Sequence, residues 1–279
     1  MQKIVTDWAG KSRRLNWKPS LPNHRELKYS HIEQMSSPVV LPSSVDLRPL
    51  CSPVRDQGQW GSCSSFASGA AVEFLQLQEL RLKVPEGQDP QVYVEGQFMP
   101  VSEFFIYYGE RKIEGTTGSD AGATTLADAG RVLVNEGVCR LSTWPYSDQN
   151  IFVAPSQAAY AEALKHKLTA FYALEGLAEL KRCLANGFPF ICGIPVCTSF
   201  MSASVASSGV IPYPSDSDSV EGGHAVCIVG YDDSKQCFIL RNSWGTDWGM
   251  QGYAWIPYSY INDLADDEYT FRRQPTTAP

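Results

Sequence analysis

The sequence predicts an α+β fold in which a helical half packs against a half built from antiparallel strands. Three observations carry this prediction. Apolar residues recur at helical spacing between about residues 63 and 137, and after about residue 165 the apolar runs become short, strand-like and separated by turns. The chain is also long enough for a substantial core, with 279 residues of which 43% are hydrophobic. A cleft between the two halves is expected.

The first forty residues differ from the rest in charge. They hold seven Lys and Arg against three Asp and Glu, a net of +4, so residues 41–279 must carry −11 to give the total of −7. Pro19, Pro22 and Pro38 and the weak periodicity predict a mostly extended basic arm with one short helix near its start. The arm is expected to lie along the surface of the acidic body.

The body begins with helices. Residues 63–82 follow Ser62, a residue type that caps helices, and have apolar side chains at helical spacing. Further helices are predicted over residues 102–112, after a capping serine, over 123–137, closed by Gly137, and over 176–187. Strands are predicted within residues 167–174, 188–196, 222–231, 237–244 and 252–258. The turn DDSK should join the third and fourth strands as a hairpin. The predicted units are the arm, 1–40, the helical half, 41–150, and the strand-rich half, 151–279.

Cys63, in RDQGQWGSCSSFASG, lies in the first turn of the predicted long helix. The positive end of a helix dipole lowers the pKa of a thiol placed there, although a lone cysteine at such a position is more often a packing residue. A nucleophilic thiol also needs a base. Among the four histidines only His224 begins a predicted core strand, and Asn242 ends the strand paired with it, where it could orient the imidazole. His24, His31 and His166 are expected to have no chemical role.

These segments resemble the papain-like cysteine peptidases over about residues 41–271. DQGQWGSCSSFA is similar to the nucleophile segment of that family, GGHAVCIVGYDD to its histidine strand and RNSWGTDWGMQGYAWI to its asparagine strand. The resemblance implies a papain-like fold, with a helical half and an antiparallel β-barrel-like half on either side of the cleft. It also implies peptide-bond hydrolysis through a thiolate–imidazolium pair and an acyl-enzyme intermediate.

Site roles follow from the same resemblance. Cys63 would be the nucleophile, His224 the general base and acid, and Asn242 the residue that orients the imidazole. Gln57 and the Cys63 backbone N–H would form the oxyanion hole. Substrate contacts are implied for Gly122, in the loop GSDAGA, for Gly223, and for Trp244, which would also shield the hydrogen bond between His224 and Asn242.

Two departures from the family pattern stand out. Trp60 and Ser119 occupy the positions of a usual disulfide, and the joint loss of both cysteines favours a reducing compartment, the cytoplasm. Ser64 follows the nucleophile where an aromatic residue is usual, so the start of the helix should be packed differently. The eight cysteines are otherwise expected to be mostly buried free thiols.

Composition limits the partners. The net charge of −7 and the lack of a basic stripe argue against nucleic acid, no apolar run or signal segment indicates a membrane, and no Cys or His spacing suits a metal or cofactor. We expect a monomeric endopeptidase acting on peptides or proteins. An acyl transferase or amidase with the same triad and a silent peptide-binding module stay open. The arm could restrain access to the cleft or only stabilise the body, and acidic residues around Glu221 could favour basic substrate side chains.

Overall fold

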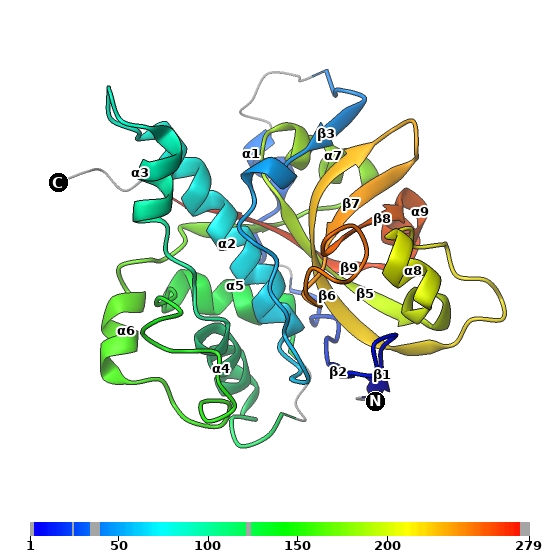
Figure 1. Ribbon diagram of the computed structural model, residues 1–279, viewed down its shortest axis with the longest axis horizontal. Helices are drawn as coiled ribbons and strands as arrows, with labels where there is room; N and C mark the ends of the chain where they lie inside the picture. The colour runs from blue at the N-terminus through cyan, green and yellow to red at the C-terminus, as the bar shows by residue number, and fades with distance from the viewer. Residues whose placement is uncertain (1–2, 24, 34–39, 121–123, 274–279) are drawn as a thin grey trace.

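The computed structural model describes residues 3–23, 25–33, 40–120 and 124–273. Its helices gather mainly on one side of a seven-stranded antiparallel sheet, with α7, α8 and α9 on the other side (Figure 1). The α-helices are α1 (Tyr29–Glu33), α2 (Cys63–Leu82), α3 (Pro90–Gln97), α4 (Glu103–Glu114), α5 (Leu126–Asn135), α6 (Gln157–Ala163), α7 (Gly176–Ala185), α8 (Ala203–Ser208) and α9 (Tyr258–Leu264). The strands are β1 (Lys3–Thr6), β2 (Ser12–Leu15), β3 (Ser44–Asp46), β4 (Ala170–Ala173), β5 (Phe190–Cys197), β6 (Val220–Asp232), β7 (Cys237–Arg241), β8 (Tyr253–Pro257) and β9 (Asp266–Arg272).

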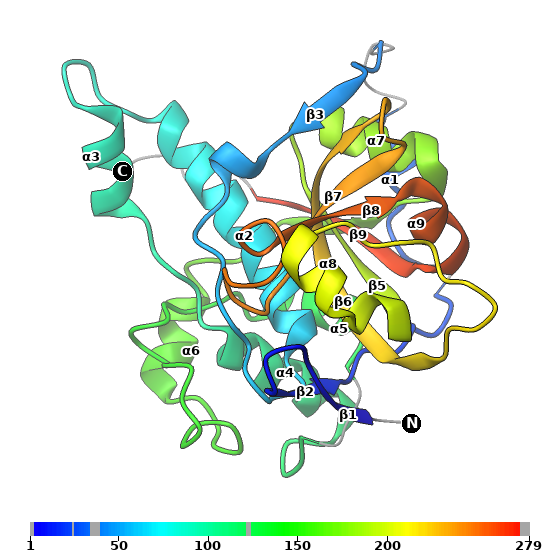
Figure 2. The same cartoon turned by 45° about the vertical axis from the view of Figure 1, so that its right-hand side comes forward.

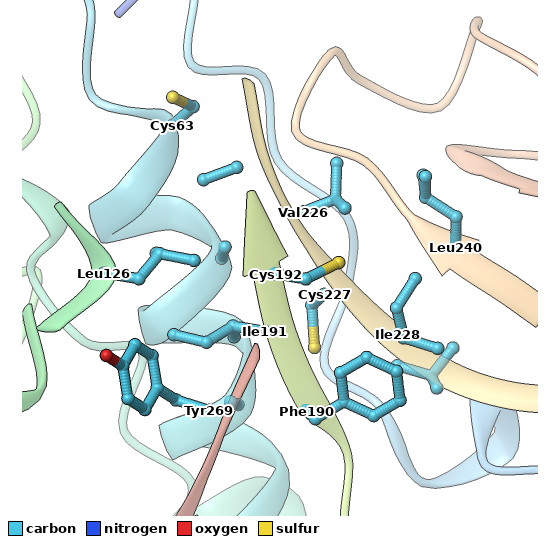
Figure 3. Packing of buried hydrophobic residues seen from close by; sticks show 14 of the residues in the cluster. Cys63, Leu126, Phe190, Ile191, Cys192, Val226, Cys227, Ile228, Leu240 and Tyr269 are labelled. Carbon is cyan, nitrogen blue, oxygen red and sulfur yellow. The ribbon is translucent and has the colours of Figure 1, made fainter. Parts of the chain in front are cut away.

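Helix α2 is the central element and has the predicted bounds. It packs against α4 and α5 on one side and against β5, β6 and β9 on the other, and its first fifteen residues are almost all buried. Figure 3 shows apolar side chains of the sheet, among them Ile191 and Tyr269, beside this helix. Because α2 lies between the two halves, its first residue stands where those halves meet.

The other predicted helices form with shifted ends. Ser102 caps α4 by accepting a hydrogen bond from the Phe105 N–H at 3.1 Å, and Gly115 ends the helix in the left-handed conformation. Helix α5 is shorter than predicted because Thr125, whose hydroxyl accepts from the Asp128 N–H, caps it. Helices α3, α8 and α9, which have eight residues or fewer and little periodicity, were not predicted.

All five predicted strand segments belong to one sheet with the order β4-β9-β5-β6-β7-β8, and β3 pairs with β6. The hairpin of β6 and β7 forms at the predicted turn. The sheet is open: in the described part of the chain its outer strands β4 and β8 do not pair, so the predicted barrel-like half does not close into a barrel. Strand β9, which joins β4 to β5, was not predicted because its DDE start suggests a loop.

The arm begins with a hairpin of β1 and β2, not with the expected short helix. Asp7 accounts for the difference because its Oδ1 accepts the N–H groups of Ala9 and Lys11 at 2.9 Å, and Gly10 takes a positive φ in the turn. The short helix, α1, lies near the end of the arm. Figures 1 and 2 both place the hairpin at the end of the molecule where α2 begins.

Candidate active site

Cys63 is the first residue of α2 and is fully buried. Ser62 occupies the N-cap position, but its hydroxyl bonds the Tyr146 hydroxyl at 2.7 Å and does not cap the helix. Burial raises the pKa of the Cys63 thiol to about 11, whereas backbone N–H groups of Ala225, Asn16 and Ser64 lower it. In Figure 3 the thiol lies at the end of the helix, apart from Cys192 and Cys227 in the core.

His224 and Asn242 are brought together by the hairpin of β6 and β7, as predicted. His224 Nε2 lies 2.8 Å from Asn242 Oδ1, and the imidazole Nδ1 has no hydrogen-bond partner in the described structure. The ring of Trp244 covers this pair, with its centroid 5.0 Å from the imidazole centroid. Burial lowers the pKa of His224 to about 4, although its hydrogen bond to Asn242 Oδ1 raises the pKa; the nearby Arg13 guanidinium lowers it further. Burial at this site therefore favours the neutral thiol and the neutral imidazole.

Gln57 lies in the loop before α2 and is also buried. Its Nε2 donates to the Trp60 carbonyl at 2.9 Å, and its Oε1 accepts from the Ser243 hydroxyl at 2.6 Å. The Gln57 backbone N–H donates to the Ser243 carbonyl at 2.8 Å. These bonds fix the amide beside the start of α2 and use only one of its two N–H donors.

The backbone of the arm lies between the two walls of this site. The Trp17 N–H donates to the carbonyl of Gly223, directly before His224, at 3.2 Å. On the opposite wall the Thr124 N–H donates to the Asn16 carbonyl, and the Lys18 N–H donates to the Thr124 carbonyl, both at 3.2 Å. Residues 16–18 thus use backbone groups on both sides of Cys63.

The Trp17 side chain explains two glycines of the sheet. A Cβ at Gly193 would lie 1.8 Å from Trp17 Cε2, and a Cβ at Gly223 would lie 2.2 Å from the Trp17 carbonyl oxygen. The indole N–H donates to the buried carboxylate of Asp267 at 3.2 Å. Only glycine at these two positions leaves room for the arm in this place.

The hairpin region of the arm contacts Trp244, the residue that packs against His224. The buried Arg13 pairs with Asp7 at 2.8 Å and with Asp56, and its guanidinium lies 5.6 Å from the ring centre of Trp244. Trp8 also packs against that ring. Further ion pairs between the arm and the body are Lys3 with Glu221, Lys11 with Asp56, Arg14 with Asp120, Lys18 with Glu114 and Lys28 with Glu175.

The remaining predicted features have mixed outcomes. Gly122 lies outside the described residues. Each of the eight cysteines is a free thiol. Trp60, which stands at one position of the disulfide usual in the family, donates its indole N–H to Asp148 at 2.8 Å. Among the residues that the structure describes, no group of three or more His, Cys, Asp and Glu is placed to hold a metal ion. None of the described helices is long and apolar enough to cross a membrane.

Sequence reasoning missed several residues at this site, including Thr124, Asp267, Gly193 and Glu110. Two of them carried a signal. Gly193 interrupts an apolar strand, which often marks the close approach of another chain segment. Glu110 falls on the same helical face as Ile106 and Tyr107, so its burial could have been predicted. Thr124 and Asp267 gave no sequence signal.

Comparisons with known proteins identify the family of this chain. The sequence model of the papain family of cysteine proteases matches residues 107–267. This chain belongs to that family. Xylellain, a cysteine protease from Xylella fastidiosa, has a similar structure, with a TM-score of 0.81 and 32% sequence identity over 98% of this chain and 99% of that one. The predicted papain-like fold and cysteine peptidase family are confirmed.

The curated relatives of this papain-family chain are longer than the part of them that it matches. An uncharacterized peptidase C1-like protein of Acanthamoeba polyphaga mimivirus is 34% identical over 76% of this chain and 67% of its own length. Cysteine proteinase 1 of Entamoeba histolytica is 28% identical over 82% of this chain and 65% of its own length. The chain therefore spans about two thirds of each of these relatives.

Proposed function

We propose that this chain hydrolyses internal peptide bonds with Cys63 as the nucleophile. His224 acts as general base and acid, Asn242 orients the imidazole, and Gln57 with the Cys63 N–H binds the oxyanion. The observation that best supports this assignment is the bond between His224 Nε2 and Asn242 Oδ1 beside a thiol at a helix N-terminus. This bond leaves imidazole Nδ1 without a described partner and able to exchange a proton with the thiol.

In this proposal the thiolate attacks the substrate carbonyl and forms a tetrahedral oxyanion next to the Gln57 amide. His224 then protonates the leaving amine, and an acyl-enzyme remains on Cys63. A water molecule gives a proton to His224, attacks the acyl group and releases the second product. The site is completed by residues of a single chain, which favours a monomer, and its free thiols favour a reducing compartment.

We also propose that the arm, residues 1–40, restrains this activity and is not merely a stabilising strap. The backbone groups of Gly223 and Thr124 that would bind an extended substrate are occupied by Trp17, Asn16 and Lys18. Cover by the arm also contributes to the burial that keeps Cys63 and His224 neutral. Release of the arm would hydrate both groups and allow them to form the reactive ion pair.

The test uses the full chain with a recognition sequence for a specific protease introduced within residues 34–39. After folding, the linker is cut, the arm is washed away in salt, and cleavage of a fluorogenic peptide and of an unfolded protein is measured before and after. We expect kcat/KM to rise on cutting and internal bonds to be cleaved, with no activity in Cys63→Ser. Unchanged kcat/KM would refute the restraint, and an active Cys63→Ser variant would refute the assigned nucleophile.

A further inference from the structure

A buried chain of hydrogen bonds lies directly behind the nucleophile. It joins Ser64, in the first turn of α2, Glu110, in α4, and Thr124, just before α5. The Ser64 hydroxyl donates to Glu110 Oε2 at 2.6 Å, and Ser64 Oγ lies 2.7 Å from Thr124 Oγ1. All three residues are fully buried. The side chains therefore connect three segments through direct hydrogen bonds in the interior.

The charge state of Glu110 determines the direction of these bonds. When Glu110 is ionised its carboxylate only accepts, so the Ser64 hydrogen points to Glu110 and Ser64 Oγ accepts from the Thr124 hydroxyl. The hydrogen bonds then run from Thr124 through Ser64 to the carboxylate. The other oxygen, Glu110 Oε1, has no hydrogen-bond partner in the described structure, so the network is the main polar anchor of this buried acid.

Ser64 and Thr124, the two hydroxyl residues of this network, each adjoin a different part of the active site. Ser64 follows Cys63, and its position fixes the first turn of α2. Thr124 provides the backbone N–H and carbonyl that hold Asn16 and Lys18 of the arm. Glu110 thus links the nucleophile to the wall that binds extended backbone. The aromatic residue usual at position 64 in papain-like peptidases could not form this network.

Glu110 also acts on the thiol through its charge. Burial raises the pKa of Glu110 to about 8; Asp128, on α5, raises it as well, whereas the Ser64 and Thr124 hydroxyls and Arg111, on α4, lower it. When ionised, Glu110 raises the pKa of Cys63. Glu110 therefore affects Cys63 both through its contact with Ser64 and through its charge.

We propose that Glu110 is a positioning residue of this peptidase. Through Ser64 and Thr124 it fixes the start of α2 against the peptide-binding wall, and its carboxylate bonds the residue that directly follows Cys63. The inference rests on the proposed role of Cys63 as nucleophile.

The test compares Glu110→Gln with wild type in the full chain. Glutamine keeps an oxygen that can accept from Ser64 but removes the charge. The rate of iodoacetamide alkylation at Cys63, located by mass spectrometry, is measured from about pH 5 to about pH 10. We expect the alkaline part of the profile to move about one pH unit lower in the variant, since a like charge has been removed. Glu103→Gln, on the same helix and equally buried but beside Arg55, is the control and should leave the profile unchanged.

A second variant, Thr124→Val, tests the structural link with the shape of the side chain preserved. In protein whose arm has been cut as described above, KM should rise about two- to tenfold with kcat nearly unchanged, as expected for one lost hydrogen bond.

The outcomes separate the two proposals. A Glu110→Gln profile identical to wild type, an equal shift in Glu103→Gln, or an unchanged KM in Thr124→Val would each overturn the inference while Cys63 remained the reactive thiol. Alkylation that never singles out Cys63 in any variant, even after the arm has been cut as described above, would instead refute the proposed function on which the inference rests.

Discussion

Replacing Trp17 by alanine should open the cleft. Trp17 is only 9% exposed, its ring fits against Gly193, and its indole N–H bonds Asp267. Truncating a buried tryptophan in packed surroundings costs about 3–5 kcal/mol. Since about 1.4 kcal/mol changes an equilibrium constant tenfold, release of the arm should become roughly 100- to 4,000-fold more favourable.

The assay is the rate of iodoacetamide alkylation at Cys63 in the full chain near neutral pH. We expect Trp17→Ala to raise this rate by about 100-fold or more, until the arm is fully released and the thiol itself limits the reaction. Leu21→Ala is the matched control, because Leu21 belongs to the same arm but is 87% exposed, and its rate should equal that of wild type. An unchanged rate in a Trp17→Ala protein with a normal circular dichroism spectrum would refute the view that Trp17 holds the cleft closed.

Three further predictions also test how the arm binds over Cys63 and His224. Gly193→Ala should also raise alkylation of Cys63, because the new Cβ would lie 1.8 Å from Trp17 Cε2; a normal wild-type rate would contradict this fit. Acid should release the arm: the pKa of buried His224 is about 4 against an ordinary 6.5, so cover is favoured above pH 6.5 and weakened as pH falls toward 4. Loss of hydrogen-exchange protection at the Trp17 amide, corrected for intrinsic rates, would report this release, and constant protection would refute it. Glu221→Gln removes a partly exposed ion pair with Lys3, so it should weaken the arm by at most about 1 kcal/mol while lowering the preference for Arg over Leu substrates; unchanged selectivity would exclude a role of Glu221 in recognition.

Local patterns predicted much of this molecule. The spacing of apolar residues gave α2 with its observed bounds, and the DDSK turn gave the hairpin that unites His224 with Asn242. The motif segments gave the catalytic candidates and the family. These features depend on residues close in sequence, or on two strands joined by a short turn, so short-range chemistry is enough to predict them.

Contacts between distant segments could not be predicted in the same way. The net charge of the arm indicated an affinity for the acidic body, but net charge does not specify where along the body each arm residue binds. The position of Trp17 against Gly193 and Gly223 depends on the shape of the surfaces that it contacts. The pattern of residues 3–15 likewise gave no hairpin, because Asp7 and Gly10 act through a local turn that apolar periodicity does not record.

The chemistry of the nucleophile shows the same division. The residue types and order of Cys63, His224 and Asn242 are enough for the sequence alone to propose the reaction. Whether the thiol and imidazole are charged depends on burial, on Arg13 and on Glu110, and these come together only when the arm, α2 and α4 pack around one point. Desolvation and Coulomb energy depend on distance in space, so chain folding, and not sequence spacing, sets the protonation state of this site.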